Sequence, residues 1–313
     1  MGYCLLTNMG LKRDSSYDCF KALLLLGRVS NLPTIWSNCL ASWLLAGGTL
    51  LETADLQRFS CLIVGTTLLY LAGMFLNDAF DVRFDKEHRT ERPIPSGAIS
   101  AKAVWVWGII QMVIGLGCLV WIGPVVAVCA FALAGSVLWY DWIHKRITWS
   151  PLIMGLCRLS LYVLAGVVAA ESPTASLGLP VILSALALWG YIVGLSNIAR
   201  HEATGGNVNS WPSWLLVLPL AIAFTLPGLV VDGEVNWNRL IIAACLYSLW
   251  IGRSLLFTFK VMIPQHGRTV SGLLAGIVLF DFMLAASQEI HMGAVFLGLF
   301  GLALLFQRYI PAT

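Results

Sequence analysis

The sequence predicts an all-α, polytopic membrane protein of nine or ten transmembrane helices. Of its 313 residues, 58% are hydrophobic and only 11% are charged, and the mean hydropathy is +0.82. Charged residues make up about a quarter of an ordinary soluble domain, so the composition excludes that class. Apolar windows long enough to cross about 30 Å of hydrocarbon recur at 22–48, 59–80, 102–122, 124–143, 152–171, 178–199, 213–231, 240–259, 270–287 and 291–309.

Two of the breaks between these windows leave the helix count open. They lie at Gly123-Pro124 and near Ser287-Gln288-Glu289. Glycine and proline can also kink one continuous membrane helix, so nine and ten helices both fit the pattern. The polar segments are too short to fold separately, and we expect a single membrane domain over residues 1–313.

Basic residues segregate to one side of these spans. With ten spans and the N-terminus inside, Arg58 and Arg239 fall outside, Arg158 falls within a span, and the other basic residues share the inner side. Cytoplasmic loops are rich in lysine and arginine. We therefore expect both termini, with a tail of residues 1–20, to be cytoplasmic. This bias accounts for the formal charge of +3, so no nucleic-acid partner is expected.

The most informative polar cluster follows the second span. Asn77, Asp81 and Asp85 recur every four residues, and a helix would place them on one face. Asp78 lies seven residues before Asp85 and joins the same face. Carboxylates this close repel one another and need a positive charge, and hard oxygen ligands suit Mg²⁺. Because Mg²⁺ often completes its shell with phosphate oxygens, the cluster predicts a phosphorylated or diphosphorylated ligand.

An alternative interpretation is a solvated acidic helix end, paired with Arg83, Lys86 and Arg89. Acidic residues are scarce in this chain, 16 in all, and the cluster lies at a membrane boundary. That position favours the metal site.

Residues 83–100 form a charged loop after the cluster, and its two prolines stop any helix. Lys86, Arg89 and Arg92 are suited to grip diphosphate oxygens that the metal does not reach. We expect the segment to act as a cytoplasmic lid that excludes water from a reactive intermediate. The alternative is a positive-inside loop with local ion pairs.

Two other polar features have a functional and a structural interpretation. Residues 139–146 (Trp-Tyr-Asp-Trp-Ile-His-Lys-Arg) end the fourth span, where aromatic and basic residues also serve as membrane anchors. Arg158 lies inside the fifth span, where an unpaired charge costs about 3 kcal/mol or more. It should therefore face a polar cavity or a partner. Asp281, in the ninth span, raises the same question.

The pattern N-D-x-x-D-x-x-x-D at 77–85, followed by R-P-x-P-S-G at 92–97, resembles the first signature of the UbiA-type intramembrane prenyltransferase superfamily. Tyr140 and Lys145 resemble the tyrosine and lysine at the end of that family's fourth helix. Residues 27–33 (GRVSNLP) resemble the start of its first helix. The resemblance extends from about residue 25 to about residue 205.

This resemblance implies a helical barrel around a central cavity, with a cytoplasmic cap and a lateral opening to membrane lipid. It also implies an enzyme that binds an isoprenyl diphosphate through Mg²⁺. The prenyl group would pass to a small acceptor, often aromatic.

The departing diphosphate carries several negative charges, so catalysis should come chiefly from Mg²⁺ and fixed cations. The expected metal ligands are Asn77, Asp78, Asp81 and Asp85. The expected diphosphate contacts are Arg28, Lys86, Arg89, Arg92, Tyr140, Lys145, Arg158 and Arg200. The residues expected to act in catalysis are Asp81, Asp85, Lys145 and Arg200. The allylic cation needs apolar and aromatic walls, for which the available aromatic residues are Trp105, Trp107, Tyr162, Trp189 and Tyr191.

The chain departs from the family at the second aspartate-rich motif, D-x-x-x-D, which follows the sixth helix and holds a second Mg²⁺. Arg200 and Thr204 occupy the two aspartate positions here, and only Glu202 remains acidic. Arg200 could supply the missing positive charge itself, or Glu202 could hold a loosely hydrated ion. A third alternative is that transferase activity is lost or replaced by another carbocation reaction.

Three functions therefore stay open. The first is prenyl transfer to a small acceptor, and the second is a UbiA-type terpene cyclase, in which the substrate's own double bond attacks the cation. The third is a non-enzymatic lipid or metabolite transporter, which would not need four hard ligands beside a basic loop. A CDP-alcohol phosphotransferase is excluded, because its D-G-x-x-A-R signature is absent.

Overall fold

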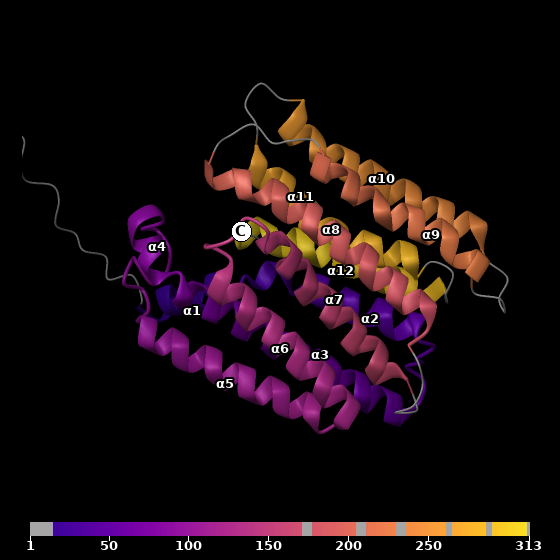
Figure 1. The fold of residues 1–313 in the computed structure, drawn as a ribbon, viewed down its shortest axis with the longest axis horizontal. Helices are drawn as coiled ribbons and strands as arrows, with labels where there is room; N and C mark the ends of the chain where they lie inside the picture. Colours follow the sequence, from indigo (N-terminus) through magenta and orange to yellow (C-terminus); the bar gives the residue numbers. More distant parts are fainter. Residues whose placement is uncertain are drawn as a thin grey trace, which may run out of the picture.

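The fold is an all-helical bundle, seen in a computed structural model that describes residues 15–170, 177–204, 211–229, 236–260, 265–285 and 290–311. Most helices run side by side along the long axis of the molecule (Figure 1). The described residues contain no β-strand. The α-helices are α1 (Ser15–Leu26), α2 (Leu32–Leu45), α3 (Thr53–Phe80), α4 (Val82–His88), α5 (Ala101–Val120), α6 (Pro124–Ile143), α7 (Ser150–Ala169), α8 (Leu179–Thr204), α9 (Leu218–Leu229), α10 (Trp237–Phe259), α11 (His266–Leu284) and α12 (Ile290–Tyr309).

Within the described ranges, 8 helices are long and apolar enough to cross a membrane. They are α3, α5, α6, α7, α8, α10, α11 and α12. The prediction of an all-α, multi-pass membrane protein is confirmed. The break at Gly123-Pro124 separates α5 from α6, while the break at 287–289 lies outside the described residues.

Two of the ten apolar windows do not form a single long helix. The window 213–231 contains a 3₁₀ helix, η2 (Trp211–Val217), followed by α9, and this apolar stretch is shorter than the other spans. The window 22–48 is divided into the end of α1, a 3₁₀ turn named η1 (Val29–Asn31), and α2. Hydropathy averages over such interruptions, because the residues on both sides remain apolar.

The interruption of the first window is centred on Arg28. Its backbone is left-handed, with φ 41° and ψ 50°, a conformation that does not continue an α-helix. Pro33, in the first turn of α2, has no N–H to donate and fits the start of a new helix. Irregular backbone at membrane depth persists only where protein buries it or where it lines a cavity. Ser30 and Asn31 are indeed buried.

The core has two large apolar clusters, with α2 and α7 contributing to both. One fills the space among α8, α9, α10 and α11, and the other lies among α3, α5 and α6. The outer faces of α5 and α10 instead expose large apolar side chains, as expected of helices in contact with lipid. Gly65 and Gly115 bring α3 and α5 close together, since a Cβ on Gly115 would lie 2.9 Å from the Gly65 carbonyl oxygen.

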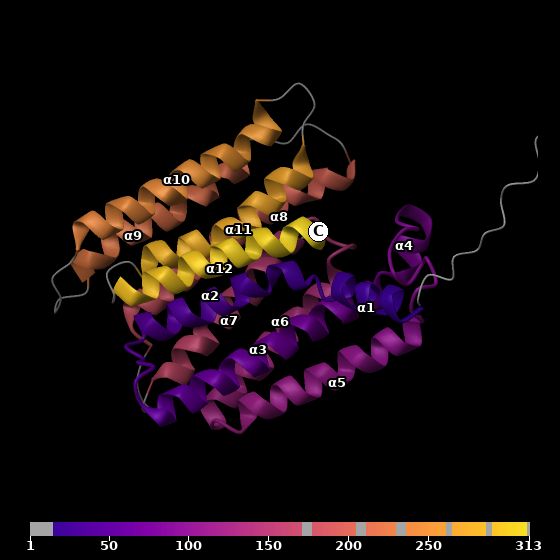
Figure 2. The same ribbon diagram turned by 180° about the vertical axis from the view of Figure 1, so that it is seen from behind.

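The segment after α3 lies at one end of the bundle, where α4 stands beside α1 (Figure 2). Ile94 ties this segment down, because it is buried against Leu26, Phe75, Ala79 and Val104. The loop predicted to be a lid is therefore partly helical and is anchored on α3 and α5.

Candidate active site

A cavity of about 330 Å³ opens inside the bundle, between α2, α3, α6, α7, α8 and α11. One part of its wall is charged and includes Asp81, Arg92 and Lys145. Another part is apolar and includes Leu133 and Ile192. A site of this kind suits an amphiphile with a charged head and a hydrocarbon tail.

The acidic cluster lies where α3 gives way to α4. Asn77 and Asp78 are in the last turn of α3, Asp81 links the two helices, and Asp85 is in α4. All four side chains are buried. Asn77 and Asp81 line the cavity, whereas Asp78 and Asp85 are not part of its wall.

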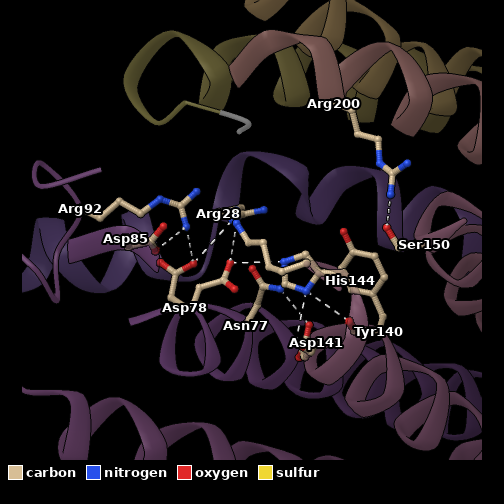
Figure 3. A network of polar contacts seen from close by, with 12 residues as sticks. Arg28, Asn77, Asp78, Asp85, Arg92, Tyr140, Asp141, His144, Ser150 and Arg200 are labelled. Carbon is tan, nitrogen blue, oxygen red and sulfur yellow. Dashed lines mark hydrogen bonds and ion pairs between the residues drawn. The ribbon is translucent and has the colours of Figure 1, made fainter. Parts of the chain in front are cut away.

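Arg92 neutralises two of these carboxylates (Figure 3). Its Nη1 lies 2.9 Å from Asp78 Oδ1 and 3.3 Å from Asp85 Oδ2. Arg28 adds a longer contact of 3.6 Å between its Nη2 and Asp78 Oδ1. The loop after α4 therefore returns to the cluster and places a guanidinium between two carboxylates, which counters their mutual repulsion.

Asp81 has a different set of partners, which come from the end of α6. Its Oδ2 lies 3.3 Å from His144 Nε2 and 3.2 Å from Lys145 Nζ. Burial disfavours the charged carboxylate, but the hydrogen bond from His144 and the charges of His144 and Lys145 outweigh it. The pKa of Asp81 is therefore lowered from its ordinary value, and the carboxylate is ionised at neutral pH.

Asp141 and His144 were not among the residues predicted for the site. Asn77 Nδ2 donates a hydrogen bond of 3.0 Å to Asp141 Oδ1, which orients the carboxamide. The second oxygen of Asp141 is buried without a hydrogen-bond partner in the described part of the chain. One signal was present in the sequence: Tyr140, Asp141, His144 and Lys145 are three or four residues apart and share a helix face.

The donors of the acidic cluster fit Mg²⁺ chemically. They are carboxylate and carboxamide oxygens, and Asp85 Oδ1 is buried without a partner among the described residues. In that part of the chain, no three His, Cys, Asp or Glu side chains are close enough to enclose an ion by themselves. Mg²⁺ needs only one or two carboxylates when water and phosphate oxygens complete its shell. The chemistry of these oxygens therefore fits an ion that shares its shell with a phosphorylated ligand.

Of the other residues predicted to contact the diphosphate, some line the cavity and one does not. Arg28, Arg89, Tyr140 and Lys145 line the cavity. Tyr140 stacks on His144, with ring centroids 4.8 Å apart. Lys86 is exposed on α4 and does not line the cavity.

Arg200 lines the cavity on the opposite side and is separated from the acidic cluster (Figure 3). Its guanidinium donates to the carbonyl oxygens of Ile147 and Thr148 and, at 2.7 Å, to Ser150 Oγ. It thus holds the end of α8 against the start of α7. The side chain of Glu202, the other residue predicted for the second motif, lies outside the described residues.

Arg158 also lines the cavity, but its contacts are with α2 and not with the acidic cluster. Its Nη1 is 2.9 Å from Asn38 Oδ1, and its Nη2 is 2.9 Å from Thr34 Oγ1. Asn38 in turn donates a 2.7 Å hydrogen bond to the buried carboxylate of Asp281. A connected polar network thus exists inside the membrane-spanning region, as the isolated charges at Arg158 and Asp281 had suggested.

None of the five aromatic residues considered for the cavity wall lines it. Trp107 is half exposed on the outer face of α5, whereas Tyr162 and Tyr191 are fully buried in helix packing. The observed wall is mainly aliphatic, with Tyr70 and Tyr140 as its aromatic members. Composition alone did not reveal which face of each helix turned inward.

Comparison with known proteins agrees with this geometry. The family model described as the UbiA prenyltransferase family matches residues 32–256. A digeranylgeranylglyceryl phosphate synthase from Pyrococcus horikoshii is 53% identical over 45 residues, which cover 14% of this chain and 16% of that protein. A 4-hydroxybenzoate octaprenyltransferase from Polynucleobacter asymbioticus is 38% identical over 88 residues, which cover 27% and 29%.

Two solved structures share the fold. A digeranylgeranylglyceryl phosphate synthase superposes with a TM-score of 0.60 at 18% identity, over 87% of this chain and 99% of that one. A UbiA homolog from Archaeoglobus fulgidus, bound to DMAPP and Mg²⁺, superposes with a TM-score of 0.56 at 14% identity, over 83% and 99%. Since the family model covers most of the chain, this membrane protein belongs to the UbiA prenyltransferase family.

Proposed function

We propose that the protein ionises an isoprenyl diphosphate with the help of Mg²⁺ and transfers the prenyl group to a small acceptor. The observation that carries this proposal is the cavity itself, where one part of the wall holds carboxylates and cations and another part is aliphatic. The charged part suits a diphosphate with its metal, and the aliphatic part suits a prenyl chain.

In this proposal, Asn77, Asp78, Asp81 and Asp85 hold the ion together with the diphosphate oxygens. Asp141 orients Asn77 through the 3.0 Å hydrogen bond between their side chains. When bound, Mg²⁺ supplies a Lewis acid that stabilises the negative charge of the departing diphosphate.

The cations around the cavity stabilise the same charge. Lys145 and Arg28 face the cavity beside the acidic cluster, and Arg89 and Arg92 face it from the loop after α4. When a diphosphate binds, Arg28, Arg92 and Lys145 can exchange their carboxylate partners for phosphate oxygens. Arg200, across the cavity, adds a fixed charge where relatives of the family carry the second aspartate motif. We propose that Tyr140 and Lys86 have supporting roles, in packing at the site and in attracting the polyanion.

We further propose that residues 83–100 cover the site as a lid and that the site and both termini face the cytoplasm. Ile94 and Arg92 anchor this segment over the acidic cluster. A covered site keeps water away from the allylic cation, which would otherwise be hydrolysed.

Named relatives support this choice of chemistry. The A. fulgidus homolog was solved with DMAPP and Mg²⁺. The named synthases of glyceryl phosphate and 4-hydroxybenzoate products are prenyl-transferring enzymes whose acceptors differ. For this chain we therefore propose only that the acceptor is a small molecule that enters the same cavity.

The decisive experiment measures diphosphate release by the purified protein in nanodiscs. Geranyl, farnesyl and geranylgeranyl diphosphate are each tested with and without Mg²⁺. We expect release only with Mg²⁺ and a loss of about 100-fold or more in Asp81→Asn, since a charged metal ligand is removed. Glu87→Gln, an exposed acidic residue on α4, is the matched control and should behave like the wild type.

Equal release with and without Mg²⁺, or in Asp81→Asn and the wild type, would sink the proposal. Product analysis separates the alternatives. Turnover that requires an added acceptor identifies a transferase, whereas a cyclic hydrocarbon or alcohol formed without an acceptor identifies a cyclase. Binding without turnover of any diphosphate would favour a transporter.

A further inference from the structure

We propose that Arg158 forms the centre of an anion site within the membrane-spanning region, which binds the acidic group of the acceptor. The ligand class is a small molecule with a carboxylate or a phosphate monoester. This inference rests on the proposed function for its biological meaning, but the site is defined by contacts that do not depend on it.

Arg158 lies inside the membrane-spanning helix α7, where an unsatisfied charge is costly. It is nine residues into α7, so about 12 Å from Ser150 along the helix axis. Its side chain remains partly accessible and reaches the cavity wall. A guanidinium at membrane depth is costly unless polar groups or a ligand satisfy it.

The protein side of the guanidinium is tied down by α2. Nη1 and Nη2 each donate a 2.9 Å hydrogen bond, to Asn38 Oδ1 and Thr34 Oγ1 respectively. Nη1 also donates to the carbonyl oxygen of Thr34 at 3.4 Å, and all three contacts are made to neutral oxygens. Among the described residues, no carboxylate lies within ion-pair distance of Arg158. The positive charge is thus fixed in place without being neutralised by direct contact.

Asn38 lies between Arg158 and the buried carboxylate of Asp281. Its carboxamide accepts from Arg158 and donates to Asp281 Oδ2 at 2.7 Å. Ser37 donates a second hydrogen bond, of 2.5 Å, to the same oxygen. A direct arginine–carboxylate pair would use the planar fork of the guanidinium. With the amide inserted, Asp281 orients Arg158 through Asn38, and α2 takes three of the five guanidinium N–H groups. The Nε–H and the second N–H of Nη2 remain able to bind a carboxylate or phosphate.

The position of the site relative to the acidic cluster suits an acceptor better than a diphosphate. Tyr70 lines the cavity and donates a hydrogen bond to the carbonyl oxygen of Arg28, whose guanidinium reaches Asp78. Arg158 makes no contact with any residue of the acidic cluster. Arg158 is therefore held by α2 independently of the cluster, although Arg158, Asn77 and Asp81 line the same cavity. This assignment replaces the diphosphate role predicted for Arg158 from the sequence.

The N-terminal end of α2 adds to the attraction for an anion. Thr34 lies in the first turn of this helix, and Asn31, just before it, lines the cavity. The N-terminus of a helix carries a partial positive charge, which the apolar surroundings screen poorly. Arg158 and the helix end act in the same direction, so a neutral analogue of the acceptor should bind less tightly than the acid.

The test measures binding of matched probes to the protein in nanodiscs, with Mg²⁺ and saturating inorganic diphosphate to occupy the cations beside the acidic cluster. The probe pairs are 4-hydroxybenzoate with 4-hydroxybenzamide, and glycerol 1-phosphate with glycerol. We expect one anion to bind the wild type at least tenfold more tightly than its neutral partner. The pair that shows the preference distinguishes a carboxylate from a phosphate ligand.

Four variants then locate the preference. Arg158→Gln should abolish it, Arg158→Lys should retain part of it, and Arg253→Gln, an exposed arginine of α10 outside the cavity, should leave it unchanged. Asn38→Asp keeps Arg158 but gives it a carboxylate partner, and should also abolish the preference. This variant tests the site even if Arg158→Gln fails to fold.

The inference is overturned if the wild type does not distinguish charged from neutral probes in either pair. It is equally overturned if Arg158→Gln or Asn38→Asp, with diphosphate binding intact, keeps the preference. The assay needs no turnover. A preference found in a protein that releases no diphosphate would therefore contradict the proposed function alone, and turnover without the preference would contradict this inference alone.

Discussion

Lys145 Nζ lies 3.2 Å from Asp81 Oδ2 and 3.8 Å from the centre of the Phe84 ring. The contact joins the end of α6 to the junction of α3 and α4, two segments far apart in the sequence. It holds a cation beside the acidic cluster, where one part of the cavity wall is charged.

Replacing Lys145 should impair the site without unfolding the protein, since its side chain is one-third exposed. In Lys145→Met, the proposed function predicts that KM for the prenyl diphosphate rises about tenfold and kcat falls about 100-fold, because a cation proposed to face the leaving group is lost. Steady-state kinetics at saturating Mg²⁺ measures both. The neighbouring Arg146→Gln is the control, because Arg146 lies over Trp142 and outside the cavity. Equal losses in the two variants would contradict a specific role for Lys145.

Arg92 should matter for stability as well as for activity. In Arg92→Gln, the buried carboxylates of Asp78 and Asp85 lose their shared cation, which should cost on the order of 3 kcal/mol and loosen the loop after α4. We expect faster limited proteolysis within residues 89–99 and a lower thermal midpoint. Arg83→Gln, on the exposed face of α4, should match the wild type in both measurements. Unchanged proteolysis in Arg92→Gln would refute its role as an anchor.

Arg28 combines a side chain that we propose to bind the diphosphate with a left-handed, strained backbone, and two substitutions separate these properties. Arg28→Ala and Arg28→Gly both remove the guanidinium that lies 3.6 Å from Asp78. Only glycine adopts φ 41° without a steric penalty, so Arg28→Gly should be more stable than Arg28→Ala by about 1 kcal/mol. Both should weaken diphosphate binding equally. Thermal unfolding reports the backbone strain, and KM for the diphosphate reports the loss of the guanidinium. An alanine variant as stable as the glycine variant would argue against strain at this position.

The close approach of α3 and α5 can be tested on two glycines of the same helix. A Cβ on Gly115 would lie 2.9 Å from a backbone oxygen of α3, whereas a Cβ on Gly117 would meet nothing within 4 Å. We expect Gly115→Ala to lower the thermal midpoint by several degrees, because the two helices must separate. Gly117→Ala should leave the midpoint unchanged or slightly raised. A reversal of this order would show that the helices pack differently.

The acidic cluster could be predicted from sequence because its signal is local. Four polar residues at helical spacing, at the end of an apolar window, share a face whatever the rest of the chain does. Their partners could not be predicted in the same way. Arg92 and Lys145 were predicted to contact a diphosphate, but not as ion-pair partners of the carboxylates, and His144 was not predicted at all. Arg92 comes from a loop and the other two from the end of another helix, so only the tertiary structure shows these pairs.

The network around Arg158 was half visible in the sequence. A charge inside a span indicated a polar partner, but Asn38 lies in an apolar window where single polar residues are common. Thr34, Ser37 and Asn38 are spaced three and four residues apart, and that periodicity was the available clue. The break at Arg28 was hidden for a different reason, since mean hydropathy does not respond to the backbone conformation of one residue.

The divided first window also has a consequence for how the chain is assembled. Ser30 Oγ donates to the carbonyl oxygen of Pro311 at 3.4 Å, and α12 packs against both η1 and α2. The turn that carries Arg28 meets α3 early, through Tyr70, but obtains this second neighbour only after translation has reached α12. Until then η1 and α2 lack part of their support, so their final packing belongs to a late stage of biogenesis.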